Sequence, residues 1–411
     1  MWLAANLPDA LTPDTMNRRH FLSLTSAAPL LGLPWANGLH ASTGAALQPP
    51  SLLVLVYLRG GNDAYNTFVP LNDARYRKLR PNIAIAREQL IPFSGTHGFN
   101  QALKPLMPLW ENKEMLLLQG IGQQEITNQH FRDAETQFTA ASPGQYYTDG
   151  WLTRALGANV GNRRLGTSQL DALAFGDLDI REGDPMGPFR GDKARVINMQ
   201  HPSEWLSGRR VVGTQYLATA PARAIAETFS QPQRVTLKTN FPAHEFGDAL
   251  RATAELAAAG LAPPVVHVTL TASDDDQHHA FDTHWDQRKY HGRTLTRLAE
   301  GLSAFRNAMR EIGLWDNTLV ATYDEFGRCP KENDKQGTHH GWGSTHFVLG
   351  GKVKGGLLGE PVPVVDVFAI DGPPPVIDYR ELYTSIIEQW WGGKARGVFD
   401  RNFKTLEILR S

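Results

Sequence analysis

Side chains that bind metal ions recur at separated points of this sequence, mostly just after a short apolar run. Carboxylate and imidazole groups together suit zinc, manganese or a similar divalent ion, and calcium is a further possibility. Two such ions a few ångströms apart would clamp the oxygens of a phosphate or sulfate ester. A hydroxyl and a guanidinium nearby would add a nucleophile and an anion-binding cation. The candidates are Asp63, Thr127, His130, Asp282, His284, Asp324, Arg328 and His340.

Apolar runs predict the strands that position these residues. Leu52–Leu58 is uninterrupted, as in a strand buried on both faces of a parallel sheet. Similar runs lie at 115–118, 265–270, 318–322 and 347–349. Helical patterns alternate with them at 103–110, 246–259, 288–312 and 379–391. The predicted fold class is therefore α/β, with a mostly parallel central sheet flanked by helices.

The candidate residues are expected to converge, because ligands of open α/β sheets bind beyond the carboxyl ends of the strands. Each residue alone has a plainer interpretation. Asp63 would form a tight turn, and Thr127 would cap a helix whose free N–H groups attract an anion. Asp274–Asp276 would be a solvated acidic loop. Five strand-end loops with such side chains nevertheless favour one shared site.

Composition and missing motifs exclude other classes of function. The formal net charge is −1 and no polybasic run occurs, which argues against a nucleic-acid partner. The glycine patterns at 120–125 and 350–356 fit neither a dinucleotide loop nor a P-loop, and no G-x-S-x-G nucleophile elbow is present. Cys329 is the single cysteine, so the chain has no internal disulfide.

Residues 1–46 are predicted to be a leader, with Met16 as its start. Arg18 and Arg19 precede an apolar stretch of about 13 residues, shorter than the roughly 20 that span a bilayer. Small residues suited to a peptidase follow. This pattern is typical of a twin-arginine signal and predicts a periplasmic or secreted protein with no transmembrane segment after cleavage. Residues 47–411 are expected to form a single domain with an irregular insertion near 140–240.

Several long motifs together resemble a known family. NRRHFL, YLRGGNDAYNTFVP, FDTHWDQ, DEFGRCPKEN and GTHHGWGSTHFVLGGKVKGG look like the domain-of-unknown-function family 1501, whose members are exported by the twin-arginine route. That family is placed in the alkaline phosphatase and sulfatase superfamily. The resemblance implies that fold, bound divalent metal, and an exported partner protein.

The resemblance also implies a role for each matching position. Asp63 would bridge two metals, and Thr127 would be the nucleophile. We expect His130 or Arg328 to hold the substrate anion. The other metal ligands would be Asp282, His284, Asp324 and His340.

Three positions depart from the family pattern. Glu325 stands where the superfamily usually has a histidine, His339 where the family usually has an aspartate, and Gln129 where it usually has a serine. Two functions therefore remain open. One is a metal-dependent hydrolase of small anionic esters or surface polymers. The other is a non-catalytic binding or assembly protein that acts with an envelope partner.

Overall fold

The protein is described by a computed structural model that covers residues 51–160, 170–176, 187–199, 201–207, 235–271, 280–366, 372 and 374–410. The chain divides into two units, Met1–Gln48 and Pro49–Ser411, and the described residues all belong to the second. The predicted leader, the acidic loop Asp274–Asp276 and part of the predicted insertion lie outside the described residues.

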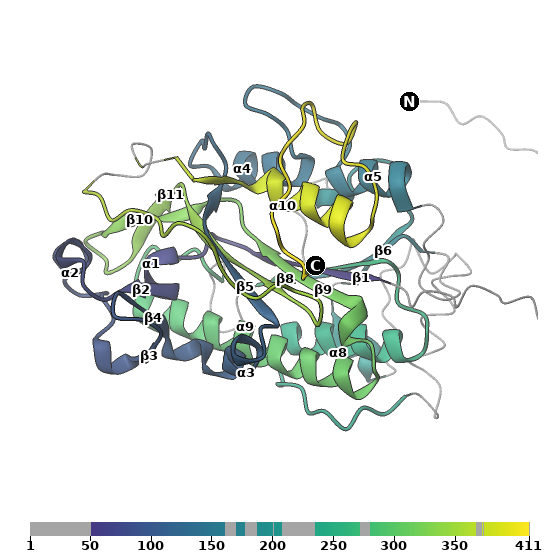
Figure 1. Cartoon of the computed structure of the whole chain (residues 1–411), viewed down its shortest axis with the longest axis horizontal. Coiled ribbons are helices and arrows are strands. Elements are labelled where there is room, and N and C mark those ends of the chain that lie inside the picture. Colours follow the sequence, from purple (N-terminus) through teal and green to yellow (C-terminus); the bar gives the residue numbers. More distant parts are fainter. Residues whose placement is uncertain are drawn as a thin grey trace, which may run out of the picture. The chain divides into compact units, whose positions relative to one another are not determined.

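A nine-stranded sheet forms the centre of the fold, with strand order β13-β5-β12-β9-β1-β8-β6-β7 and β14 beside β5 (Figure 1). Neighbouring strands are parallel except β12, which runs antiparallel to β5 and β9. The predicted mostly parallel sheet is thus confirmed. Its strands are β1 Leu52–Leu58, β5 Met115–Gly122, β6 Ala172–Phe175, β7 Val196–Met199, β8 Val265–Leu270, β9 Thr318–Tyr323, β12 Ser344–Leu349, β13 Gly356–Gly359 and β14 Ile377–Asp378.

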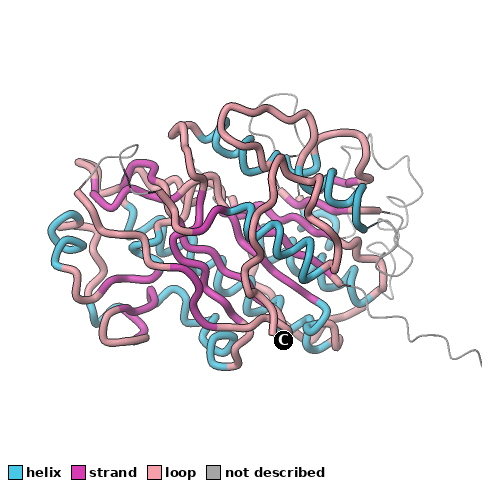
Figure 2. The backbone as a smooth tube through the Cα atoms, turned by 45° about the horizontal axis from the view of Figure 1, so that its top comes forward, coloured by secondary structure: helices cyan, strands magenta, loops and turns pink. Residues whose placement is uncertain are grey.

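Helices cover both faces of this sheet (Figure 2). Alternate residues of β1 enter two separate cores, as the uninterrupted apolar run predicts. Val54 and Val56 pack toward α3 (Met107–Glu111), α8 (Glu245–Ala258) and α9 (Gln287–Glu311). Leu53 and Leu55 pack toward α4 (His130–Thr139), α5 (Trp151–Ala155) and α10 (Tyr379–Ser385). Each buried aliphatic side chain contributes about 1.5–3 kcal/mol, so β1 is strongly fixed.

Two smaller sheets extend beyond the central one. Strands β2 (Phe68–Pro70), β4 (His97–Asn100) and β3 (Leu90–Pro92) form an antiparallel sheet. It lies near the short helices α1 (Ala64–Thr67) and α2 (Ala74–Leu79). Strands β10 (Gly327–Glu332) and β11 (Thr338–Gly341) form a hairpin between β9 and β12. This hairpin carries candidate site residues.

The segment predicted as an irregular insertion adds to the main sheet. Strands β6 and β7 pair in parallel there, and β6 also pairs with β8. Each of these strands has only four residues, and α6 (Pro202–Leu206) has five. Elements this short give little periodic signal in a sequence, which is why the segment reads as irregular.

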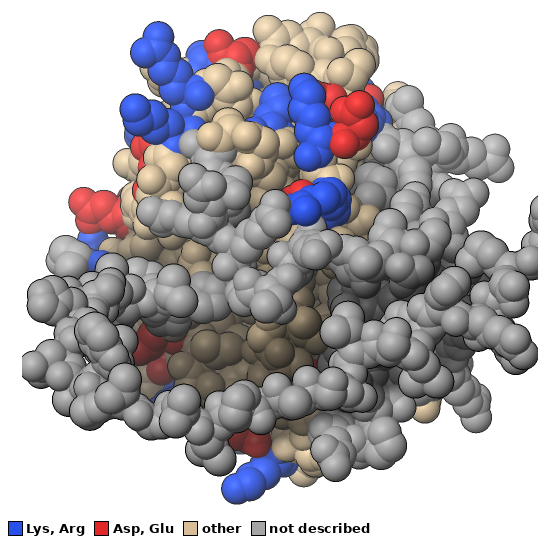
Figure 3. Space-filling model, turned by 90° about the vertical axis from the view of Figure 1, so that its right-hand side faces the viewer, with Lys and Arg blue, Asp and Glu red and all other residues tan. Residues whose placement is uncertain are grey.

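No helix among the described residues is both long and apolar enough to cross a bilayer. Basic and acidic side chains are interspersed on the described part of the face shown in Figure 3. This mixture agrees with the near-zero net charge of the chain.

Candidate metal centre

Four side chains from three segments bring potential metal-ligating atoms within 4.8 Å of one another. His130 is the first residue of α4, and His340 lies on β11. Asp282 and His284 lie between β8 and α9. The sequence predicted three of them as metal ligands and His130 as a group that holds the substrate anion.

The three imidazoles surround one carboxylate. The Nε2 atoms of His284 and His340 lie 3.0 and 3.4 Å from Asp282 Oδ1, and His130 Nε2 lies 3.3 Å from Oδ2. His284 Nε2 and His340 Nε2 are 3.0 Å apart. Four ligands of a tetrahedral zinc ion, each about 2.0–2.1 Å from the metal, are about 3.3 Å apart. The observed spacings therefore fit a mixed imidazole and carboxylate ligand set.

Two glycines allow these segments to approach one another. Gly60 follows β1 with φ +108°, and a Cβ at this position would lie 2.3 Å from the backbone nitrogen of Asp282. Gly337 precedes β11, and a Cβ there would lie 2.0 Å from the carbonyl carbon of His284. A side chain at either position would displace a backbone segment that carries candidate ligands. The glycines of the RGGND and QGTHH motifs thus help to set the group's geometry.

Two of the imidazoles are held through the ring nitrogen that faces away from Asp282. His130 Nδ1 lies 2.7 Å from Glu325 Oε1, and His340 Nδ1 lies 2.9 Å from the carbonyl oxygen of Asn128. Phe326 stacks on His340 with ring centroids 4.2 Å apart. Metal-binding histidines commonly donate their second N–H to a carboxylate or carbonyl in this way, which leaves Nε2 available for the metal.

The side chains of the group have pKa values that are shifted in different directions. Burial opposes ionisation of Asp282, but hydrogen bonds from His130, His284 and His340 and the charge of Arg328 outweigh it and hold its pKa well below the usual range. Burial also opposes protonation of His130, yet hydrogen bonds to Asp282 and Glu325 raise its pKa to about 9. Burial lowers the pKa of His340 to about 4, so this ring is neutral at pH 7.

Arg328 lies behind Asp282 rather than in an open position for substrate. Its side chain has no exposed surface, and its Nη2 contacts Asp282 Oδ1. The other guanidinium contacts are the carbonyl oxygens of Gly60, Gly61 and Thr338. In the structure the predicted anion-binding arginine therefore anchors the Asp282 carboxylate.

Asp63 stands outside the group of four. Its Oδ1 accepts hydrogen bonds from the backbone N–H groups of Tyr65 and Asn66, which caps α1. Its Oδ2 lies 2.6 Å from Arg80 Nη1 and also accepts from Gln287 Nε2. Burial would raise the pKa of Asp63, but Arg80 outweighs it and lowers the pKa. Four donors fill the acceptor positions of this carboxylate, so protein groups occupy the place predicted for metals.

Asp324 also stands outside the group of four. Its Oδ2 accepts from the backbone N–H of Asn62 at 2.9 Å and from the Ser344 hydroxyl at 2.5 Å. Its Oδ1 lies 3.3 Å from His346 Nε2. The carboxylate is only 1% exposed. Asp324 thus links the loop after β1 to the start of β12. The prediction of Asp324 as a metal ligand did not include this structural role.

Thr127 contacts a carboxylate that lies outside the group of four. Its hydroxyl donates to Asp133 Oδ1 at 3.0 Å, and its backbone N–H donates to the same carboxylate. Burial raises the pKa of Asp133 to about 6. The neighbouring residue, Asn128, has φ +59° and turns its carbonyl oxygen to His340. The structure thus shows Thr127 as part of the turn that presents Asn128 and His130.

Two supporting residues were not identified from the sequence. Arg80 follows α2, and its guanidinium reaches Asp63 and the carbonyl oxygens of Cys329 and Pro330. Glu325 was noted only as a departure from the family pattern, but it contacts His130. No local motif marks Arg80. For Glu325, its place at the end of a predicted strand was the available signal.

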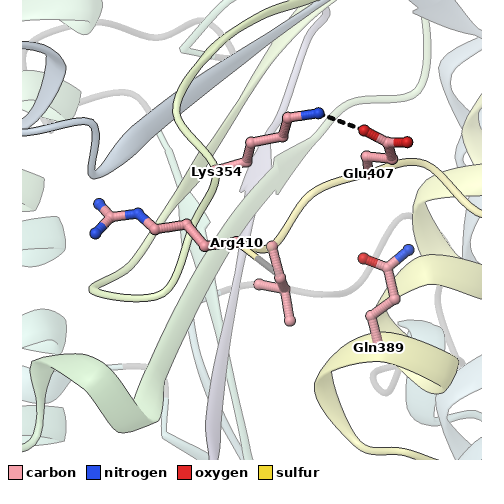
Figure 4. A pocket seen from close by; sticks show the side chains of 5 residues that line it. Lys354, Gln389, Glu407 and Arg410 are labelled. Carbon is pink, nitrogen blue, oxygen red and sulfur yellow. Dashed lines mark hydrogen bonds and ion pairs between the residues drawn. The ribbon is translucent and has the colours of Figure 1, made fainter.

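A surface pocket lies at the opposite end of β5 from this group. Lys354, Gln389, Glu407 and Arg410 line it with Leu409, and Lys354 points to Glu407 in an ion pair (Figure 4). Arg410 donates to the carbonyl oxygens of residues 112 and 113, just before β5. Gln123, just after β5, donates to the Glu325 carbonyl oxygen beside the candidate centre. The pocket is therefore separate from the candidate metal centre.

Solved structures that are similar to this chain include proteins described as a lipoteichoic acid synthase, a sulfatase and a member of the alkaline phosphatase superfamily. The lipoteichoic acid synthase LtaP from Listeria monocytogenes is 12% identical, with a TM-score of 0.42, over 88% of this chain and 76% of that one. A Bacteroides thetaiotaomicron protein, BT33494S-sulf, is 9% identical, with a TM-score of 0.41, over 84% and 73%. An alkaline phosphatase superfamily protein from Vibrio parahaemolyticus is 8% identical, with a TM-score of 0.38, over 85% and 68%.

Comparison of the sequence with known proteins gives a narrower result. No curated protein matches it. One family model matches a continuous segment that contains Asp282, His284 and His340 of the candidate centre. Residues 228–373 match the family described as "Protein of unknown function (DUF1501)", so the predicted family resemblance is confirmed for this segment.

Proposed function

We propose that His130, Asp282, His284 and His340 bind one divalent metal ion, with zinc the best fit to their chemistry. The observation that carries this proposal is the convergence of three imidazole Nε2 atoms on one carboxylate, with spacings of 3.0 to 3.4 Å. Three histidines and one carboxylate are donors that zinc accepts. Manganese is the second choice, because it takes the same donors with a stronger preference for oxygen.

We further propose that the centre hydrolyses phosphate or sulfate esters. When bound, a divalent ion would polarise an ester oxygen and make a water molecule more acidic. The protein's own residues would hold the ligands in place, with Arg328 fixing Asp282 and Asn128 fixing His340. The side chains of His284 and His130 are 29% and 24% exposed, so a small anionic ester or the end of a polymer can reach the group.

We also propose that the protein acts outside the cytoplasm, in the periplasm or secreted. The support is the sequence of residues 16–46, with its paired arginines, short apolar stretch and small residues. A reporter fused to residues 16–50 should be exported only when the twin-arginine machinery is present. Export by the general secretory route would contradict this proposal.

Metal content is the first test of the proposed centre. Protein purified without chelator or metal-affinity resin should carry about one equivalent of zinc or manganese by mass spectrometry. Asp282→Ala and His340→Ala should lose it, whereas His201→Ala, in an exposed histidine outside the group, should keep it. Aryl phosphate and aryl sulfate turnover should fall with the metal. A metal-free wild-type protein that takes up no added metal would refute the proposal.

A non-catalytic binding or assembly function is the alternative. The observation that favours it is that Asp63 and Asp324 are each bound by other protein groups, Asp63 by Arg80 and Asp324 by the backbone of Asn62 and the Ser344 hydroxyl. Only one of the three aspartates predicted as metal ligands therefore lies at the candidate centre. In that case the metal would be structural, and an exported partner would cover the site. Tagged mature protein should then capture a stoichiometric envelope partner while ester turnover stays at background. Turnover without a partner would exclude it.

A further inference from the structure

We propose that Glu325 is a positioning residue that turns His130 toward the metal, although it is not itself a ligand. This inference rests on the metal centre proposed above. Glu325 occupies the loop after β9, and His130 begins α4, nearly two hundred residues earlier in the chain. The contact between them joins two elements that no local motif connects.

The His130 ring lies between two carboxylates. Its Nδ1 is 2.7 Å from Glu325 Oε1, and its Nε2 is 3.3 Å from Asp282 Oδ2. An imidazole presents its two nitrogens in different directions, so the Glu325 contact decides which nitrogen faces the group of four. With Nδ1 committed to Glu325, Nε2 is the atom left for a metal.

Glu325 is itself held firmly. It is 1% exposed, and its Oε1 accepts a hydrogen bond from the backbone N–H of Gly60 at 2.9 Å. Gly60 in turn lies against the backbone of Asp282. The same short segment after β1 therefore fixes both the group that orients His130 and the ligand that it faces.

This arrangement changes the meaning of the sequence departure at position 325. A glutamate in place of a histidine removes a potential ligand from the loop after β9. The structure brings an imidazole from α4 to the neighbouring position, and the glutamate orients it. Carboxylates in this position fix the ring and increase its basicity, and their loss commonly weakens metal binding by about 10- to 100-fold.

The first experiment compares Glu325→Gln with a matched control. Glutamine keeps the size of the side chain and an acceptor oxygen but removes its charge. The control is Glu332→Gln on β10, because Glu332 also accepts backbone N–H groups, from Asn82 and Ile83, and contacts none of the four candidate ligands. Zinc affinity is measured by chelator competition, and the free energy of unfolding is measured with the metal removed.

Glu325→Gln should weaken zinc binding by about 10- to 100-fold, while Glu332→Gln should bind like the wild type. Equal affinity in Glu325→Gln and wild type would overturn the positioning role and leave the metal centre standing. Failure of the wild type to bind any metal would overturn the metal centre and the positioning role together. The two failures are thus distinguishable.

A measurement on the unaltered protein covers the case in which Glu325→Gln does not fold. In zinc-loaded protein, nitrogen NMR should show His130 with a protonated Nδ1 and a metal-bound Nε2. The reverse assignment, or a His130 ring that does not respond to zinc, would overturn the inference. If Glu325 only supported the fold, nothing would require His130 to have a protonated Nδ1 and a metal-bound Nε2.

Discussion

The pairing of Asp63 with Arg80 leads to a sharp prediction, because the resemblance and the structure give Asp63 different roles. In Asp63→Asn the side-chain oxygen can still cap α1, but the charge beside Arg80 disappears. Both side chains have no exposed surface, so the guanidinium would remain buried without its counter-charge. Breaking such a pair costs about 3–5 kcal/mol. We therefore expect the free energy of unfolding to fall by about that amount.

Urea denaturation of metal-free protein measures this loss, and mass spectrometry gives the metal content of the folded fraction. We expect a large drop in stability and a metal stoichiometry like that of the wild type. Arg80→Met should also destabilise, and the double variant should lose less than the sum of the two single losses, because neither charge is then left alone. A stability change below about 1 kcal/mol together with lost metal would refute this reasoning and make Asp63 a ligand.

Three further predictions concern the fold around the site. Gly60→Ala should lower stability by about 1–3 kcal/mol and weaken zinc binding, because the residue has φ +108° and a Cβ would meet a neighbouring backbone. Gly95→Ala, with open space around it, is the control. Unchanged zinc affinity in Gly60→Ala would contradict the prediction. Burial lowers the pKa of His267 to about 3, against about 6.5 in the unfolded chain. The contribution of His267 to stability is therefore complete above pH 6.5 and is lost as the pH falls, by about 2 kcal/mol at pH 5. Denaturation of His267→Gln should show a correspondingly flatter dependence of stability on pH. Asp378→Ala removes the cap of α10 and leaves a buried arginine unpaired, so its melting temperature should fall more than that of Asp73→Ala, which removes a similar but exposed cap and ion pair.

The sequence predicted the fold well where strands were buried and uninterrupted. Leu52–Leu58 and Val265–Leu270 have the same bounds as predicted, because their apolar residues are packed on both faces. Helices α8 and α9 end close to Gly260 and Gly313, whose φ values of +71° and +73° suit a helix end. The strands β6 and β7 escaped detection because they are too short for a periodic pattern.

The site was harder to predict because the hydrogen-bond and ion-pair partners of each candidate side chain are set only in the folded chain. Asp63 follows a strand in a glycine-rich turn, and this pattern is the same whether the carboxylate faces a metal or Arg80. A helix was predicted here with Thr127 as its cap, but α4 begins at His130, and the contact of His130 with Glu325 joins distant segments. Position at the end of a strand therefore identifies candidate residues. Hydrogen-bond donors from elsewhere in the chain then decide which carboxylates remain free to bind a metal.

The reversed direction of β12 has a consequence for how the centre is encoded. A parallel strand after β9 would have required a helix to carry the chain back to the opposite edge. Since β12 runs antiparallel to β9, the chain stays at the carboxyl end of β9 and makes the β10–β11 hairpin there. Glu325, Arg328 and His340 consequently form one contiguous cassette. Substitutions within this one segment therefore change a candidate ligand and its supporting residues together, without altering the strands of the central sheet.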